Sequence, residues 1–522
     1  MNDTTAREAL PPTFAEARRA LRADETSCEA LVTAFLERID AENERLNALL
    51  SVDADGALGH ARYLDRRRKQ GRAGPLTGLV LAIKDVVAVR GDALTCGSKM
   101  LKDHTALYDA AVIERLRDAG ALFIGRANCD EFAMGSSNET SHFGPARHPE
   151  SDEHVPGGSS GGAAAAVAAG FCHAALGSDT GGSLRQPAAF CGLVGLRPTY
   201  GRVPRHGLVA HASSLDCLGP LARSVEDAAR LLDLMAGPDA RDATSADAEV
   251  PDYTAALGGD PRAALDGVRV GVPREYVDEA PFADALSGGV RQRVEAQTDA
   301  LQAAGADVVD VSMPHAPYGL AAYYVLATAE ASSNLARYDG VRYGHRFAAS
   351  SENGSANGRP EAETDGESAL ERMLARSRSE GFGEETQRRI MLGTYVLSEG
   401  ARRRYYEQAR RVRTLIKDDF DRAFDGGGPG NGSGSVDVLL TPAAPTPAFR
   451  RGSRTDDPMS MYRSDLFTVG PSLAGLPALA LPAGRHPDEP HLPVGVQLVG
   501  RAFDEAFLLQ VGEAMERFQL EN

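Results

Sequence analysis

The feature that most constrains this chain is a pair of Gly-Gly-Ser turns, one ending at Ser159 and the other at Ser183. The residues between them begin as an Ala-rich helical pattern and end as a short strand. Glycine allows the backbone to approach a ligand closely and to adopt conformations that are closed to other residues. If both turns lie at one end of a sheet, they bring the two serines together in one site.

Around these turns, apolar runs of strand length are mixed with helical patterns. The run at residues 79–87 is apolar except for Lys84 and Asp85, as in a strand that is buried on both faces. Further strands are expected at residues 122–125, 268–273, 307–311, 438–442, 478–482 and 494–499, and helices at 109–119, 288–304, 321–337, 399–424 and 503–518. The mixture predicts an α/β fold with one large mixed β-sheet between layers of helices.

The first 75 residues are expected to form a helical segment packed on a catalytic domain of residues 76–522. Helices are predicted at residues 13–22, 27–41 and 55–70, with a strand at 47–51. Thr26 and Glu29 predict a capping box at the start of the second helix. Residues 351–368 and 426–435 are Gly-rich and polar, which predicts two surface insertions without regular structure.

The two glycine turns do not fit the common phosphate-binding loops. No lysine follows either turn as a P-loop requires, and the dinucleotide fingerprint G-x-G-x-x-G is absent from this region. A Gly-rich packing region without catalytic function is the simpler alternative.

A serine nucleophile needs a base, and Lys84 is the best candidate. Burial in an apolar strand disfavours the charged form of a lysine and lowers its pKa, which can leave a neutral base near physiological pH. The alternative for Lys84 is a buried ion pair, but Asp85 points to the opposite face of the strand. Five histidines are alternative bases, but none lies in a recognisable hydrolase elbow: His142, His154, His173, His206 and His211. Of these, His173 resembles a core residue.

The chain resembles the amidase signature family in three places: Ile83-Lys84-Asp85, Gly157-Gly-Ser-Ser-Gly-Gly and Gly177-Ser-Asp-Thr-Gly-Gly-Ser-Leu-Arg-Gln-Pro-Ala. The resemblance implies the family's fold, with Ser183 as nucleophile and Lys84 as general base. Ser159 would relay the proton between them, after a cis peptide bond that follows Gly158. The backbone N–H groups of an oxyanion hole would come from Thr180, Gly181, Gly182 and Ser183, since successive donors in such a turn can point at one oxygen.

Four longer stretches are similar to one branch of that family, the glutaminase subunits of tRNA-dependent amidotransferases: residues 128–139, 198–208, 331–344 and 379–394. This similarity implies hydrolysis of glutamine to glutamate and ammonia within a heterotrimer that also contains the B and C subunits. The B subunit would bind the misacylated tRNA and use ATP and Mg²⁺ to convert Glu-tRNA(Gln), Asp-tRNA(Asn) or both. No metal or cofactor is expected in this chain itself.

Glutamine is a zwitterion, so its pocket needs a cation for the carboxylate and an anion for the amino group. By similarity to the family, Arg389 would bind the α-carboxylate, Asp465 the α-amino group, and Tyr323 would add a polar contact. The neighbours Arg388 and Tyr324 are rivals for two of these positions.

The net charge of −17 argues against binding a nucleic-acid backbone without a partner, since no basic stripe is visible beyond a short run at residues 66–69. Only five of the 56 Lys and Arg residues are lysines, and acidic residues are in surplus. This composition resembles that of a protein from a salt-loving organism, which we expect to be an archaeon.

The six cysteines are spaced singly, so neither a zinc site nor a redox motif is predicted. No leader or membrane segment is recognised, and the chain is expected in the cytoplasm.

Two other function classes stay open on the sequence. One is a stand-alone amidase that hydrolyses a small or aryl amide, because members of one fold act on unrelated substrates. The other is a non-catalytic scaffold protein, against which the complete set of Lys84, Ser159 and Ser183 argues. The ammonia route is not readable from the sequence.

Overall fold

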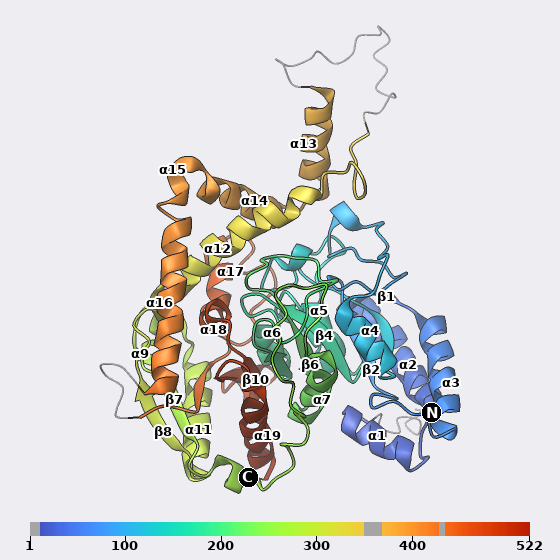
Figure 1. Ribbon diagram of the computed structural model, residues 1–522, viewed down its shortest axis with the longest axis vertical. Coiled ribbons are helices and arrows are strands. Elements are labelled where there is room, and N and C mark those ends of the chain that lie inside the picture. The colour runs from blue at the N-terminus through green and yellow to red at the C-terminus, as the bar shows by residue number, and fades with distance from the viewer. Residues whose placement is uncertain (1–10, 349–367, 427–433, 522) are drawn as a thin grey trace.

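A computed structural model describes residues 11–348, 368–426 and 434–521 (Figure 1). Its centre is a sheet of eleven strands in the order β1-β3-β2-β4-β6-β5-β10-β11-β9-β7-β8. The strands are β1 (Leu49–Val52), β2 (Val80–Lys84), β3 (Leu122–Ala127), β4 (Ala174–Asp179), β5 (Val194–Arg197), β6 (Cys217–Ala222), β7 (Arg269–Pro273), β8 (Asp307–Val311), β9 (Val438–Pro442), β10 (Ala478–Arg485) and β11 (Pro493–Val499). Parallel pairs (β2 with β3 and β4, β7 with β8 and β9) and antiparallel pairs both occur, so the prediction of a large mixed sheet is confirmed.

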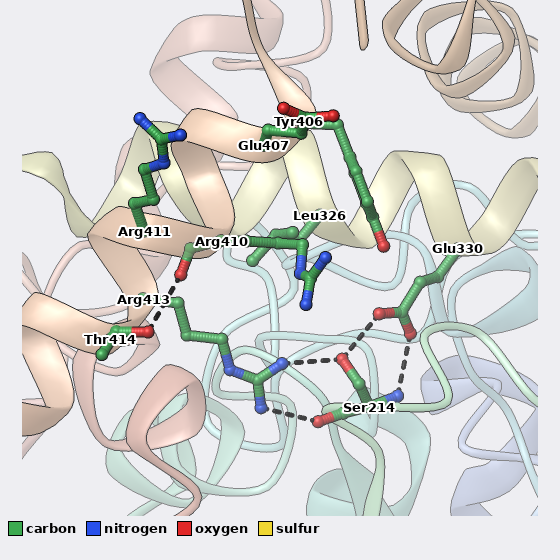
Figure 2. Close-up of a pocket in the computed structure, with 9 residues that line it drawn as sticks. All are labelled: Ser214, Leu326, Glu330, Tyr406, Glu407, Arg410, Arg411, Arg413 and Thr414. Atoms are coloured by element: carbon green, nitrogen blue, oxygen red, sulfur yellow. Dashed lines mark hydrogen bonds between the residues drawn. The ribbon is translucent and has the colours of Figure 1, made fainter. Parts of the chain in front are cut away.

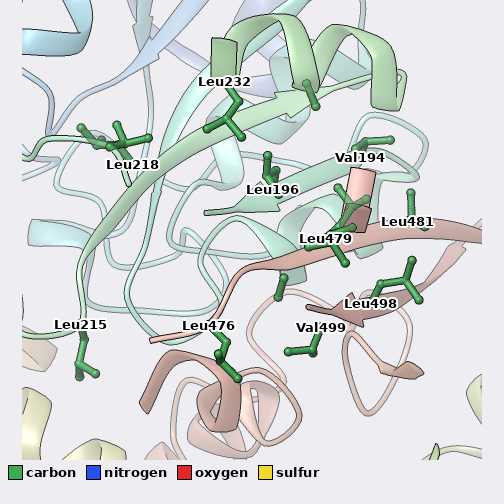
Figure 3. Packing of buried hydrophobic residues seen from close by; sticks show 14 of the residues in the cluster. Val194, Leu196, Leu215, Leu218, Leu232, Leu476, Leu479, Leu481, Leu498 and Val499 are labelled. Atoms are coloured by element: carbon green, nitrogen blue, oxygen red, sulfur yellow. The ribbon is translucent and has the colours of Figure 1, made fainter. Parts of the chain in front are cut away.

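Apolar side chains on the two faces of the sheet belong to two separate cores. In β2, Val80 and Ala82 join one cluster, whereas Leu81 and Ile83 join the other, as the two-residue period of a strand requires. Figure 3 shows part of the larger core, which includes Leu232 as well as Leu479, Leu481 and Leu498 of the late strands. Both faces are therefore buried, which explains why the strands read as continuous apolar runs.

Helices cover both faces of the sheet. The smaller core holds side chains of α1 (Phe14–Arg22), α2 (Cys28–Leu46), α3 (Ala54–Lys69), α5 (Gly161–Ala168) and α6 (Arg185–Cys191). The larger core holds side chains of α4 (Ala111–Asp118), α7 (Val225–Met235), α11 (Gly288–Ala303), α12 (Gly319–Asn334), α16 (Tyr406–Asp425) and α19 (Glu505–Glu521). The expected sandwich of helix, sheet and helix is confirmed.

The remaining helices are short or lie outside these two layers. They are α8 (Pro261–Leu265), α9 (Glu275–Asp278), α10 (Phe282–Ala285), α13 (Ala369–Gly381), α14 (Glu384–Leu397), α15 (Glu399–Arg402), α17 (Pro458–Tyr462) and α18 (Val469–Ala474), with 3₁₀ turns at Lys99–Leu101, Glu131–Ala133, Ala316–Tyr318, Leu335–Arg337 and Arg463–Asp465. Within the described ranges, no helix is both long and apolar enough to cross a lipid bilayer.

The capping box predicted at Thr26 and Glu29 is wrong. The N-cap of α2 is Ser27, whose side chain accepts from the N–H of Ala30, while Asp65 binds the N–H of Glu29 at 3.0 Å. Ser27 has the extended backbone that an N-cap needs, so the helix begins one residue later than expected.

Other local predictions need smaller corrections. The helix expected at residues 399–424 is divided into α15 and α16, and β5 and β6 were missed. Gly219 and Pro220 lie inside β6, where both residue types argue against a strand. The insertion predicted at 351–368 lies outside the described residues except Ser368, which caps α13, and of 426–435 only Gly426, Gly434 and Ser435 are described.

Candidate active site

The site lies where the parallel strands β2 and β4 end side by side. Lys84 is the last residue of β2, and β4 ends in Ser178 and Asp179, directly before the second glycine turn. The first glycine turn enters α5, which packs against both strands. Carboxyl ends of adjacent parallel strands meet at one edge, which is how the fold joins these segments.

Lys84 is completely buried and bonded to hydroxyl groups. Its Nζ donates to the Oγ atoms of Ser159 at 2.7 Å, Ser178 at 2.9 Å and Ser160 at 3.0 Å. Burial lowers the pKa of Lys84 to about 8. None of the ion pairs among the described residues includes Lys84, and Asp85 turns away to contact Arg126 and Thr95. This arrangement provides an amine that can be neutral near physiological pH and is in contact with a serine hydroxyl.

The first turn requires glycine at position 158. A Cβ atom there would lie 2.1 Å from Oδ2 of Asp130 and 2.5 Å from the backbone nitrogen of Ser137. The N–H of Gly158 donates to Oε1 of Gln186 at 2.9 Å. The peptide bond between Gly158 and Ser159 is cis, so the expectation of a cis bond at this position is confirmed.

Ser183 is joined to the group through the main chain. The N–H of Ser160 donates to the carbonyl oxygen of Ser183 at 3.2 Å, and the Ser183 side chain is buried. Across the residues that the structure describes, the Ser183 hydroxyl has no hydrogen bond, so its contact with Ser159 is not formed here. The structure therefore brings Lys84 and Ser159 into direct contact and places Ser183 beside them.

The second turn presents unused donors. No hydrogen bond within the described part of the chain uses the backbone N–H of Thr180, Gly181, Gly182 or Ser183. The side chain of Thr180 is held by Asp216 at 2.8 Å. A Cβ atom on Gly181 would lie 2.5 Å from Cζ of Tyr323, so only glycine fits against that ring. Four free N–H groups in one rigid turn can stabilise an oxyanion.

A buried ion network around Asp179, the residue directly before the second turn, supports that turn. Asp179 accepts from Nε and Nη2 of Arg185, both at 3.0 Å, and from Nη1 of Arg197 at 2.9 Å, and all three side chains are fully buried. Burial would raise the pKa of Asp179, but the two guanidinium groups bring it below its usual value. These three residues were not predicted from the sequence, although Asp179 and Arg185 lie within the second glycine motif.

A pocket of about 190 Å³ opens beside the first turn. It is lined by Ser136, Ser137, Arg388, Arg389 and Tyr462, among others. Ser136 continues inward, since its hydroxyl donates to Oδ1 of Asp465 at 2.9 Å. Ser136 thus connects the arginine-lined pocket to a buried carboxylate.

The two rival arginines differ sharply in environment. The side chain of Arg389 is 3% exposed, that of Arg388 33%. The guanidinium of Arg389 lies 5.2 Å from the ring centres of Tyr324 and Tyr462, and only its Nε is hydrogen-bonded within the described residues, to Glu385 at 2.8 Å. Its two terminal nitrogens are thus free to hold a carboxylate.

The two rival tyrosines have different contacts. Tyr324 donates to Oδ2 of Asp465 at 2.9 Å, whereas Tyr323 packs against Gly181 of the second turn. Burial raises the pKa of Asp465 to about 6, against the effect of its bonds from Tyr324 and Ser136. The predicted pocket residues therefore lie together, and Ser136 and Tyr462 are contacts that the sequence analysis did not single out.

The histidines stay outside this group of contacts. His173 packs on Phe14 and Phe35, and burial lowers its pKa to about 3, as expected of a core histidine. Among the described residues, no cluster of three or more His, Cys, Asp or Glu side chains could hold a metal ion. The groups in contact at the site are the amine of Lys84 and serine hydroxyls.

Comparison with known proteins agrees with this geometry. The family model described as Amidase matches residues 30–509. The A subunit of glutamyl-tRNA(Gln) amidotransferase from Salinibacter ruber is 58% identical, over 97% of this chain and 99% of that protein. The crystal structure of the corresponding protein from Thermotoga maritima, also an A subunit of glutamyl-tRNA(Gln) amidotransferase, is 35% identical, with a TM-score of 0.75 over 99% of this chain and 96% of that one. A peptide amidase from Stenotrophomonas maltophilia is 30% identical, with a TM-score of 0.75 over 98% of each chain.

Proposed function

The chain belongs to the amidase family, and we propose that it is the glutaminase component of a tRNA-dependent amidotransferase. The observation that carries the proposal is a pocket lined by the buried Arg389, from which Ser136 donates to the buried carboxylate of Asp465. A cation and an anion joined to one pocket in this way suit a free amino acid with both its α-groups ionised. The relative of 58% identity, named as part of such an enzyme, supports the same substrate.

In the proposed reaction, Ser183 attacks the side-chain amide carbon of glutamine. Ser159 passes the proton of Ser183 to the neutral amine of Lys84, to which it is hydrogen-bonded. The oxygen of the tetrahedral intermediate binds the free N–H groups of Thr180, Gly181 and Gly182. The C–N bond then breaks, the proton moves to the leaving nitrogen, and ammonia departs. Water attacks the acyl-enzyme by the same proton route and releases glutamate.

In the pocket, Arg389 would bind the α-carboxylate with its free terminal nitrogens, while Asp465 and the hydroxyl of Tyr324 would bind the α-ammonium group. Tyr323 would pack against the oxyanion turn and complete the pocket wall. A nearby ammonium ion favours the ionised form of Asp465, so substrate and carboxylate would stabilise each other's charge.

The ammonia would be used by partner proteins. The B and C subunits would complete a heterotrimer, in which the B subunit would bind the misacylated tRNA and use ATP and Mg²⁺. The names of the relatives support Glu-tRNA(Gln) as the substrate of the complex. The amino-terminal 75 residues would pack on the catalytic domain, and the complex would work in the cytoplasm.

The test is ammonia release from glutamine by the chain co-purified with the B and C subunits and by the chain alone, at high salt. We expect activity that needs the partners and rises with misacylated tRNA and ATP. Ser183→Ala should abolish it, while Ser51→Ala, at an exposed position of the edge strand β1, serves as the control.

The peptide amidase with the same fold favours a stand-alone amidase as the second candidate. Turnover of simple amides faster than glutamine, without any effect of the partners, would establish that candidate. Near-normal hydrolysis by Ser183→Ala would refute both.

A further inference from the structure

The outer face of α14 is apolar and, among the described residues, exposed. Its inner face packs against α12 through buried residues such as Arg389 and Gly393. On the outside, the side chains of Met391 and Tyr395 are 71% and 58% exposed, and Leu392 and Leu397 are exposed as well. Exposed apolar groups gathered in this way mark an interaction surface.

A basic stretch follows directly along the chain. Five exposed arginines lie between residues 402 and 411, and none forms an ion pair within the described part of the chain: Arg402, Arg403, Arg404, Arg410 and Arg411. The same stretch contains Glu407 as its single acidic residue. In a chain of net charge −17, this concentration of unpaired positive charge is a local exception.

The apolar and basic parts form one surface. The ring centres of Tyr395 in α14 and Tyr405 before α16 lie 6.1 Å apart. Beside them, a groove of about 590 Å³ runs between α12 and α16. Figure 2 shows the side chain of Arg410 pointing into this groove above Arg413, while Arg411 points away from it. In Figure 1, α14, α15 and α16 form an outer shoulder of the molecule, away from its amino terminus.

We propose that this shoulder, defined as the outer face of α14, the arginines of residues 402–411 and the groove between α12 and α16, docks the ammonia-accepting partner protein. The partner would present an apolar centre that matches the exposed side chains of α14, surrounded by carboxylates that match the arginines. Apolar anchors combined with arginine are typical of protein interfaces. This identification rests on the proposed function. RNA fits less well, since Glu330 and Glu407 line the groove and the outer face of α14 exposes four apolar side chains.

The groove floor is connected to the oxyanion turn. Ser214 accepts from Nη1 of Arg413 at 2.8 Å and donates to Oε1 of Glu330 at 2.6 Å. Two residues further, Asp216 holds the side chain of Thr180 at 2.8 Å. A partner seated in the groove would therefore press on the loop that positions the turn, which links docking to glutamine hydrolysis.

Association is measured first, without glutamine, so that failure of the proposed reaction does not obscure it. The full chain is titrated with the purified pair of B and C subunits from the same organism in a sedimentation experiment. One variant carries Arg403→Gln, Arg410→Gln and Arg411→Gln. The matched control carries Arg19→Gln, Arg22→Gln and Arg66→Gln, which remove the same charge from exposed, unpaired positions on α1 and α3.

We expect the shoulder variant to bind about tenfold more weakly at low salt, since each exposed ion pair contributes about a twofold factor. The control should bind as the wild type does. Met391→Gln with Tyr395→Ser should weaken association at high salt as well, because apolar contacts are not screened. Thermal unfolding of each variant checks that it is folded.

Wild-type affinity in both shoulder variants would overturn the proposal. Unchanged affinity for the partner pair, together with loss of binding to unmodified tRNA in the arginine variant, would assign the surface to RNA and overturn it equally. Stimulation of hydrolysis by the partners should fall in parallel with affinity, and full stimulation despite weakened binding would refute the link through Ser214.

Discussion

Lowering the pH should slow the enzyme by protonating one lysine. Lys84 is completely buried, the only hydrogen bonds of its Nζ among the described residues go to hydroxyl groups, and burial lowers its pKa to about 8. The proposed base must be neutral to accept the proton of Ser183. The protonated form keeps its hydrogen bond to Ser159 but cannot accept a proton.

The magnitude follows from this pKa. The neutral fraction is roughly one half at pH 8, about 10% at pH 7 and about 1% at pH 6. The turnover number kcat should therefore fall about tenfold between pH 7 and pH 6 and level off above pH 8. The same shift makes the folded protein gain stability as the pH rises from 8 to the higher pKa of the unfolded chain, because the unfolded state binds more protons in that range.

The assay is ammonia release at saturating glutamine from pH 6 to pH 8.5, with the complete complex. Saturation removes the separate effect of pH on glutamine binding. Lys84→Met should be inactive at every pH, and Lys84→Arg too, since arginine stays charged. A flat profile, or a break near pH 6.5 as for an ordinary histidine, would refute the assignment of Lys84 as the base.

Three further predictions concern the turn and the pocket. Gly181→Ala would place a Cβ atom 2.5 Å from the ring of Tyr323, so the turn must shift and kcat should fall about 100-fold while circular dichroism stays unchanged; a loss below threefold would contradict the oxyanion assignment. Arg389→Lys should raise the KM for glutamine at least tenfold, and Arg388→Lys much less; the reverse order in steady-state kinetics would transfer the role to Arg388. Asp465 has a pKa raised to about 6 and must be ionised to bind an ammonium group, so KM should rise as the pH falls below about 6. Asp465→Asn should have a high KM without that pH dependence, and a wild-type KM in this variant would exclude the contact.

The strands and helices that could be predicted from the sequence are those with a clear local pattern of apolar residues. The apolar run around Lys84 and the late strands were located to within a few residues, because strands buried on both faces have an unmistakable composition. β6 was missed because Gly219 and Pro220 disfavour a strand locally, and long-range pairing with β4 and β5 overrides that preference. The start of α2 was misplaced because either Thr26 or Ser27 could cap the helix on sequence alone.

Within the site, the sequence by itself predicted Lys84, Ser159, Ser183 and the glycine turns, since these residues lie in short motifs whose glycines include backbone conformations that other residues rarely adopt. The tertiary structure alone decided which of the two adjacent arginines is buried and which of the two adjacent tyrosines bonds Asp465, because one residue of helix turns a side chain by about 100°. It also decided that Ser136 meets Asp465 and that Asp216 holds Thr180, contacts between segments far apart along the chain. The apolar and basic shoulder appeared only when α14 and α16 were placed side by side, because exposure is a property of the packed molecule and not of its sequence.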